Sequence, residues 1–133
     1  MPKLKNPNKS QLMHIADRKF SQYWIAKIGK CEKCGRVHIK LEVAHFKSRD
    51  YKCIRYSRDN TFVLCTACHF FFHKNPDLFK EFFIEKRGDE LLLYLNKRIR
   101  VLKPLPIGWY KMQVDILKDL TNEIISDTLC ISK

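Results

Sequence analysis

The sequence predicts a small α+β protein with an N-terminal helix, a central pair of strands and a C-terminal helical extension. Apolar residues recur every three or four positions over 10–28, and again beyond residue 75, as they do on helix faces. They alternate with polar residues over 37–43, which is typical of a half-exposed strand. Two Cys-x-x-Cys pairs, at 31–34 and 65–68, enclose this strand and the segment that follows it.

The first helix is expected over residues 10–28, with Ser10 able to cap its start and Gly29 able to end it. The basic stretch before it, MPKLKNPNKSQ, lacks the apolar segment of a signal peptide. No apolar run approaches the roughly 20 residues that span a bilayer. We therefore expect no membrane partner and a location in the cytoplasm.

The central region is expected to form two strands and a helix. The alternating strand leads to His45, residues 46–60 read as a polar and basic loop, and residues 61–64 form a second short strand. A helix over 66–74 would place His69 and His73 one turn apart on the same face.

The remainder of the chain is predicted to be helical, and Gly88 and two prolines separate its parts. We expect helices at 77–87, 89–102 and about 109–127, with the segment PLPIGWY as an ordered connector at 104–110. One compact domain would then comprise a basic arm and helix (1–30), a central core (31–75) and a helical extension (76–133).

The paired cysteines predict a metal site. In a reducing compartment, two Cys-x-x-Cys pairs favour a metal ion over disulfides. Four thiolates can bind one tetrahedral Zn²⁺, and the predicted ligands are Cys31, Cys34, Cys65 and Cys68. In so small a domain this structural zinc would supply much of the folding free energy. Cys53 and Cys130 lie outside the pattern and are expected to be small buried side chains.

The net charge of +12 is concentrated in the first half of the chain. Residues 1–60 hold 15 Lys and Arg against 5 Asp and Glu, whereas residues 61–133 hold 11 against 9. A basic surface attracts polyanions and releases counterions when it neutralises phosphates. The basic run directly after His45 therefore favours contact with nucleic acid over a solvated face that only keeps the protein soluble. Its members are Lys47, Arg49, Lys52, Arg55 and Arg58.

Three histidines within the cysteine frame indicate hydrolytic chemistry. His69 and His73 could bind a single divalent cation, and His45 could face that cation from the end of the preceding strand. A neutral imidazole, with a pKa of about 6.5, can take a proton from water near neutral pH. A cation can hold a phosphate oxygen and stabilise the leaving oxygen. A base, a metal and a basic loop are the parts that phosphodiester hydrolysis needs.

The string VAHF…DNTFVLCTACHFFFH resembles the ββα-metal motif of zinc-containing HNH endonucleases. This resemblance implies a zinc-stapled ββα-metal core that cleaves DNA, with His45 as the general base and Asn60 steadying the loop and orienting His45. It also implies that His69 and His73, or His69 alone, bind a catalytic divalent ion, commonly Mg²⁺ or Mn²⁺.

The residue before the base departs from this pattern. Many members of the family have a metal-binding Asp or His there, whereas this chain has Ala44. Coordination would then fall to the two histidines, water and phosphate, unless a carboxylate such as Asp50 or Asp59 substitutes. A site without a carboxylate favours Mg²⁺ less and admits Mn²⁺.

A narrower similarity, over roughly residues 10–90, is to the phage NinG/Rap recombination proteins, through ADRKFSQYW, GKCEKCG and RYSRDN. It implies branched or junction DNA as the substrate and a phage context, and two cuts on a junction would suit a homodimer. Two alternatives remain open. One is a non-catalytic zinc module that binds DNA or RNA, and the other is an adaptor whose C-terminal helices bind a partner protein.

Overall fold

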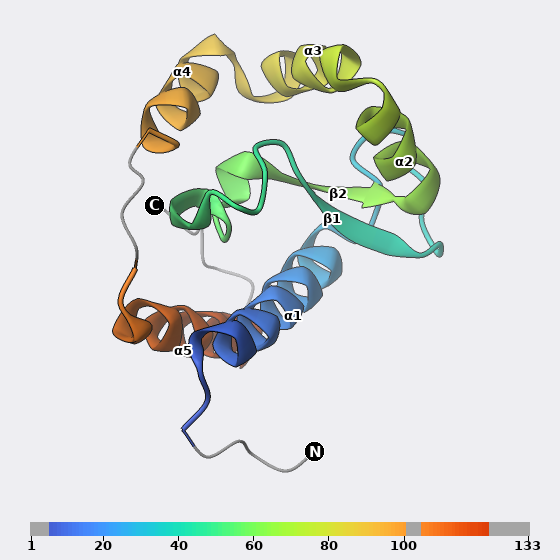
Figure 1. Ribbon diagram of the computed structural model, residues 1–133. Coiled ribbons are helices and arrows are strands. Elements are labelled where there is room, and N and C mark those ends of the chain that lie inside the picture. The colour runs from blue at the N-terminus through green and yellow to red at the C-terminus, as the bar shows by residue number, and fades with distance from the viewer. Residues whose placement is uncertain (1–5, 101–104, 123–133) are drawn as a thin grey trace.

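The computed structural model describes residues 6–100 and 105–122 (Figure 1). In these residues five α-helices surround a two-stranded sheet, which confirms the predicted α+β class. The elements in order are α1 (Lys9–Ile28), β1 (Leu41–His45), β2 (Thr61–Cys65), α2 (Thr66–Lys74), α3 (Pro76–Arg87), α4 (Asp89–Arg98) and α5 (Ile107–Asn122). Two 3-10 turns, Lys52–Ile54 and Arg58–Asn60, lie in the loop that joins the strands.

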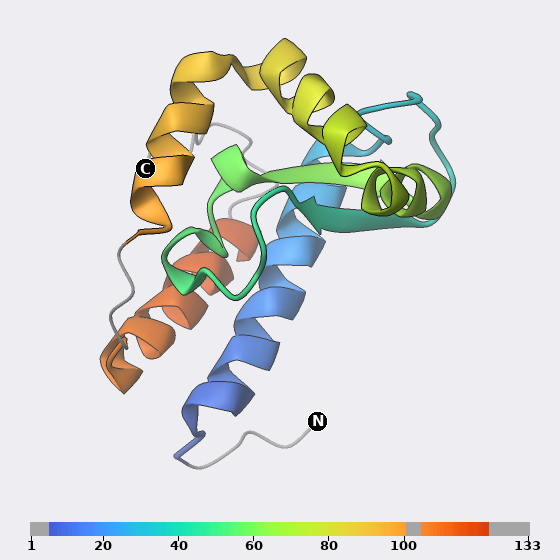
Figure 2. The same cartoon turned by 45° about the horizontal axis from the view of Figure 1, so that its top comes forward.

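The sheet separates two layers of helices. β1 and β2 pair antiparallel, with Leu41 opposite Cys65 and His45 opposite Thr61. Figures 1 and 2 show α2, α3 and α4 in an arc on one side of the strands, and α1 beside α5 on the other. Because side chains alternate along a strand, Glu42 and Ala44 face the arc, whereas His45 faces α1.

Each layer has its own core. Rings from α2 and α3 pack on the arc side of the sheet, where Phe72 stacks on Phe79 with ring centroids 4.7 Å apart. On the other side, residues of α1 and α5 pack against Val63 of β2. Two cysteines of the predicted zinc site, Cys31 and Cys65, belong to the first core. Cross-linking these cysteines through a metal would therefore tie the loop that follows α1 to the end of β2.

The ends of α1 illustrate how capping sets helix boundaries. The helix begins at Lys9, so Asn8 and not Ser10 is its N-cap. Asn8 Oδ1 accepts from the Gln11 backbone, and Gln11 Oε1 accepts from the Asn8 backbone, each at 2.9 Å. Gly29 ends the helix with a φ of 69°, as the sequence predicted.

The first strand is shorter than predicted. Residues 37–40 lie outside β1, with Val37 and Ile39 exposed and His38 at a φ of 56°. The reason is that β2 stops at Cys65, where α2 begins, so residues 37–40 have no strand to pair with.

The last helix begins earlier than predicted. α5 starts at Ile107, directly after Pro106, so part of the predicted connector is helical. Residues 123–127 of the predicted helix, 101–102 at the end of the preceding one, and Cys130 lie outside the described residues. Within the described part of the chain, no helix has the length and apolar character needed to cross a membrane.

Candidate zinc centre and histidine site

The four predicted zinc ligands meet in space. The sulfurs of Cys31, Cys34, Cys65 and Cys68 all lie within 4.8 Å of one another. The Cys34 and Cys65 sulfurs are 3.8 Å apart. Zn–S bonds of about 2.3 Å in a tetrahedron place two sulfurs roughly 3.8 Å apart. The cluster therefore fits a structural metal ion such as Zn²⁺.

Each Cys-x-x-Cys pair is folded as a metal-binding turn. The Cys34 and Cys68 backbones donate to the sulfurs of Cys31 and Cys65, each at 3.5 Å. Gly35, with a φ of 78°, closes the first turn. Burial raises the pKa of the Cys31 thiol, but backbone N–H bonds outweigh burial and lower this pKa to about 6. The lowered pKa of Cys31 favours the thiolate, which is the form that binds metal.

Asn60 fixes the loop at the end of the hairpin. Its side chain is fully buried, and Oδ1 accepts from the Lys47 backbone at 2.7 Å. Its Nδ2 donates to the carbonyls of Lys47 and Ile54, at 3.0 and 3.4 Å. Its own carbonyl accepts from the Phe46 backbone. These bonds hold the backbone directly after His45, which is a physical basis for the predicted steadying role.

His45 is held in one tautomer. Its Nε2 lies 2.8 Å from the carbonyl oxygen of Arg55. Since a carbonyl can only accept, Nε2 carries the proton and Nδ1 of the neutral ring keeps its lone pair. Burial lowers the pKa of His45 to about 4. The ring is therefore neutral at physiological pH.

Asp17 of α1 supports this arrangement, and sequence reasoning missed it. Its two carboxylate oxygens accept from Arg55 Nε and Nη2 at 2.8 and 2.7 Å, and Tyr56 donates to it at 2.8 Å. The Arg55 guanidinium is buried and also donates to the Arg49 carbonyl. Burial raises the pKa of Asp17, but the bonds from Arg55 and Tyr56 outweigh burial, so the net shift is downward. Asp17 thus anchors the segment whose carbonyl holds His45.

Replacing Asp17 with alanine is expected to lower the free energy of unfolding by about 3 kcal/mol, because Arg55 would be left buried without its anion. Urea unfolding followed by circular dichroism measures this change. Asp50→Ala, an exposed change in the loop that joins the strands, is the matched control and should unfold like the wild type. Equal midpoints for Asp17→Ala and the control would contradict the anchoring role.

The pKa of His45 makes stability depend on pH. The folded value is about 4 and the ordinary value is 6.5, so the unfolded chain binds the proton first as the pH falls. The contribution of His45 is fully present above pH 6.5 and is lost as the pH falls towards 4. We expect the unfolding free energy of the wild type to decline over this window more steeply than that of His45→Gln. Parallel declines would contradict the buried neutral state.

His69 is oriented by a carboxylate that sequence reasoning did not single out. Its Nδ1 lies 2.8 Å from Glu42 Oε1, and Glu42 also accepts from the Thr66 hydroxyl at 3.1 Å. The bond from His69 is the main cause of a lowered pKa for Glu42, which is therefore an acceptor at neutral pH. Since the carboxylate accepts from Nδ1, Nε2 is the ring nitrogen that remains to bind a metal. Histidine ligands of metals typically donate their other N–H to a carboxylate in this way.

The three predicted site histidines share one cavity. A hollow of about 440 Å³ is lined by His45, His69 and His73, together with Asp77 and Lys80. Asp50 and Asp59, the carboxylates considered above as substitutes at the metal, do not line it. Among the described residues, the four cysteines are the one group of three or more potential ligands that meet within 4.8 Å. An ion at the histidines would therefore take most of its ligands from water and phosphate.

The basic run divides into inward and outward side chains. Arg55 is paired with Asp17, and Arg58 donates to Glu32 at 2.6 Å and to the Thr61 carbonyl at 2.7 Å. Both guanidiniums hold the protein together, which argues against the predicted phosphate contacts at these two positions. Arg49 is exposed, and Lys47 and Lys52 are half-buried. Burial, with Lys80 nearby, lowers the pKa of Lys47.

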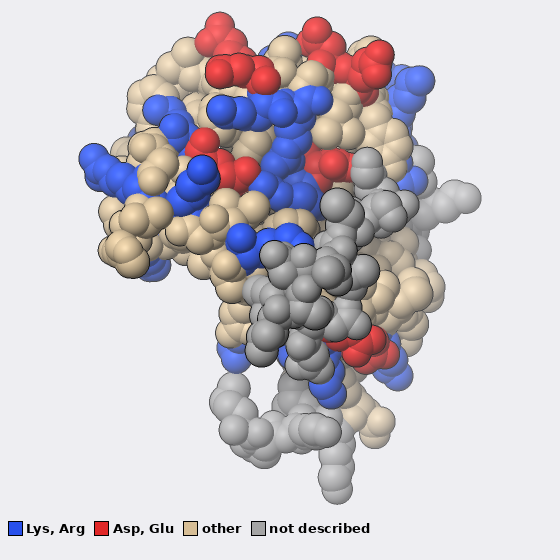
Figure 3. Space-filling view, turned by 180° about the vertical axis from the view of Figure 1, so that it is seen from behind, with Lys and Arg blue, Asp and Glu red and all other residues tan. Residues whose placement is uncertain are grey.

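Charge is mixed on the face opposite to that of Figure 1. Figure 3 shows Lys and Arg in a band across this face, with Asp and Glu on both sides of it.

No protein-family profile, curated protein sequence or solved structure matches the chain. The resemblance to HNH endonucleases therefore stays a prediction from the sequence.

Proposed function

We propose that the protein is a metal-dependent endonuclease of the HNH type that hydrolyses DNA phosphodiester bonds. The observation that carries this proposal is the state of His45. Its Nε2–H is bound to the Arg55 carbonyl, and it shares a cavity with two histidines one helical turn apart. A neutral imidazole with a free lone pair, beside a cavity that two further histidines line, has the groups needed to activate water for attack on a phosphate.

In the proposed reaction, His45 Nδ1 takes a proton from a water molecule as the water oxygen attacks phosphorus. A P–O bond of the backbone then breaks, and its oxygen leaves with the electron pair. The Arg55 carbonyl accepts from His45 Nε2 throughout and so stabilises the imidazolium that forms. A Mg²⁺ or Mn²⁺ ion bound by His69 Nε2, with His73 beside it, would supply electrostatic stabilisation to the leaving oxygen.

The outward basic side chains would place the DNA backbone over the cavity. Arg49, Lys47 and Lys52 lie on the loop that follows His45, and Lys80 lines the cavity itself. Contacts of this kind position DNA without reading its sequence. Branched or junction DNA, a phage context and a homodimer remain part of the proposal through the NinG/Rap resemblance alone.

The test is incubation of the purified protein with linear, nicked and four-way-junction DNA in Mg²⁺, in Mn²⁺ or in EDTA. We expect cleavage in at least one of the metals and none in EDTA. Circular dichroism in the same EDTA buffer shows whether the fold persists. Cleavage of equal rate with and without metal would overturn the proposed mechanism.

Glu42→Gln is expected to weaken the response to the catalytic metal by about 10–100-fold, because a neutral amide orients and polarises His69 less than a carboxylate does. The measurement is the Mn²⁺ concentration that gives half-maximal cleavage. Glu85→Gln, an exposed change on α3, is the matched control. An unchanged Mn²⁺ requirement in Glu42→Gln would contradict the orienting role of Glu42.

One observation favours a second candidate, a non-catalytic zinc module that binds nucleic acid. In the described part of the chain, the cysteines form a complete metal-binding cluster and the histidines do not. Such a module would bind the DNAs above and cleave none of them in any metal.

A further inference from the structure

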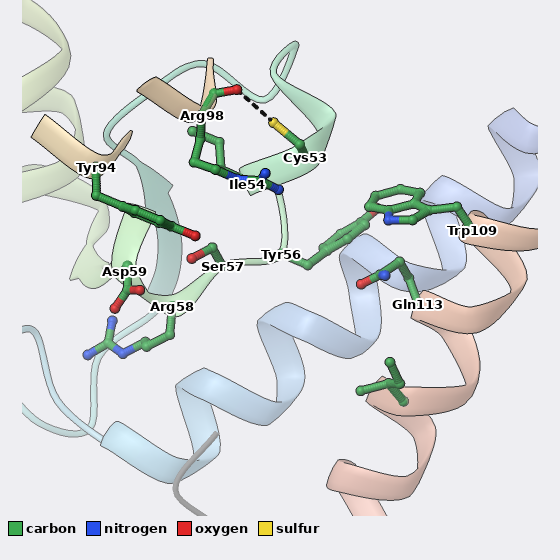
Figure 4. Close-up of a pocket in the computed structure, with 11 residues that line it drawn as sticks. Cys53, Ile54, Tyr56, Ser57, Arg58, Asp59, Tyr94, Arg98, Trp109 and Gln113 are labelled. Carbon is green, nitrogen blue, oxygen red and sulfur yellow. Dashed lines mark hydrogen bonds between the residues drawn. The ribbon is translucent and has the colours of Figure 1, made fainter. Parts of the chain in front are cut away.

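A second cavity, of about 350 Å³, lies away from the histidines, between the inter-strand loop, α4 and α5. Figure 4 shows its lining side chains, which come from all three elements and surround a common space. The loop contributes Tyr56 and Ser57, α4 contributes Tyr94 and Arg98, and α5 contributes Trp109 and Gln113.

Four polar side chains of this cavity are not used by the fold, whereas Tyr56 and Arg58 bond to Asp17 and Glu32, and the Asp59 carboxylate also lines the cavity. Within residues 6–100 and 105–122, the side chains of Ser57, Tyr94, Arg98 and Gln113 make no hydrogen bond or ion pair with another described residue. In Figure 4 the Tyr94 hydroxyl and the Ser57 side chain point towards the same space. A hydroxyl pair, an amide and a guanidinium provide donors and acceptors for the edge of a polar ring and for an anionic group attached to it.

The walls of the cavity are aromatic. Trp109 stacks on Tyr56 with ring centroids 6.1 Å apart and an interplanar angle of 26°. Tyr56 is fixed in turn by its bond to Asp17. Tyr94, 42% exposed, supplies a further ring from α4. Aromatic faces beside an arginine are the surfaces on which single nucleobases stack. The volume is that of a single small ligand and is too small for a duplex.

The cavity is connected to the histidine site through two consecutive residues. The Arg55 carbonyl accepts from His45, and the next residue, Tyr56, lines the second cavity. Phe20 contacts both rings, with centroids 5.7 Å from Tyr56 and 6.4 Å from His45. A group bound in the second cavity would therefore lie against the segment that holds the proposed base.

We propose that this cavity binds one unpaired nucleobase of a DNA substrate, stacked on the aromatic wall, with its phosphate near Arg98. The proposal rests on the proposed nuclease function for its choice of DNA as the ligand. The protein would then prefer DNA that contains an unpaired nucleotide. That nucleotide would bind in the second cavity, away from the cavity that the three histidines line.

The test compares the binding of two labelled duplexes, one fully paired and one with a single bulged nucleotide, by fluorescence anisotropy without added divalent metal. The wild type should prefer the bulged duplex on the order of 10-fold, as expected for one base–aromatic stacking contact. Tyr94→Ala should abolish this preference and leave binding of the paired duplex unchanged. Leu93→Ala, an exposed neighbour on α4 that does not line the cavity, should behave like the wild type.

Other outcomes overturn the inference in distinguishable ways. Equal binding of both duplexes, or a preference that survives Tyr94→Ala, would exclude this cavity as a nucleobase site and would leave the nuclease proposal intact. Competition by free dAMP or dTMP at the affinity of the bulged duplex would identify a mononucleotide site in place of a DNA subsite. Failure to bind either duplex would contradict the proposed nuclease function as well.

Discussion

Cys65→Ser is expected to unfold or aggregate the protein. The Cys65 sulfur belongs to the four-sulfur cluster, accepts from the Cys68 backbone, and lies in the core that joins the sheet to α2, α3 and α4. Structural zinc contributes about 10–16 kcal/mol in small zinc-dependent peptides. The whole stability of a domain is about 5–15 kcal/mol. Loss of the metal would therefore remove most or all of the free energy of unfolding.

The thermal melt and the zinc content of the purified variant measure this effect. Cys53→Ser is the matched control, because Cys53 lies outside the cluster and makes one weak bond, to the Arg98 carbonyl at 3.4 Å, which a serine can replace. The control should bind one zinc and melt near the wild type. A Cys65→Ser variant that melts as the control does would show that the metal is not part of the fold.

His45→Ala is expected to reduce the rate of DNA cleavage by about 10²–10⁴-fold, the usual contribution of a general base. The fold should persist, because the variant loses the ring contact with Phe20 and one hydrogen bond, to the Arg55 carbonyl, which costs about 1–3 kcal/mol. Single-turnover cleavage and thermal melts on the same preparation measure both quantities.

His45→Gln separates loss of the base from loss of packing. Its amide can donate to the Arg55 carbonyl but cannot take a proton from water at neutral pH. We expect it to melt closer to the wild type than His45→Ala does and to be equally inactive. A His45→Gln variant with wild-type cleavage would exclude His45 as the base.

The four-cysteine cluster could be predicted from the sequence because each half of it depends on only a few neighbouring residues. Each Cys-x-x-Cys pair specifies a turn by its own spacing, and the pairing of four sulfurs requires only that the two turns meet. The helices were accessible for the same reason, since apolar periodicity and Gly29 act over one or two turns. Residues 37–40 were predicted wrongly because pairing depends on the length of a partner strand, and Cys65 ends that strand.

The two carboxylates that support the site could not be predicted from the sequence, because their partners lie far from them in the chain. Asp17 meets Arg55 across 38 positions, and Glu42 meets His69 across 27. Asp17 lies within ADRKFSQYW, but that string does not indicate its partner, and Glu42 lies outside the strings that carry the resemblances. Arg55 resembled a phosphate ligand in the sequence because a sequence does not show whether a guanidinium is buried or exposed. Only the fold shows that the Arg55 guanidinium is buried and paired with Asp17.

The most direct test of the account is to measure zinc content and metal-dependent DNA cleavage on the same preparations of wild type and His45→Ala. We expect one zinc per chain in both proteins, cleavage by the wild type in Mg²⁺ or Mn²⁺, and no cleavage by the variant. Equal cleavage by the two proteins, with zinc retained in both, would contradict the claim that the cysteines serve the fold and His45 serves the chemistry.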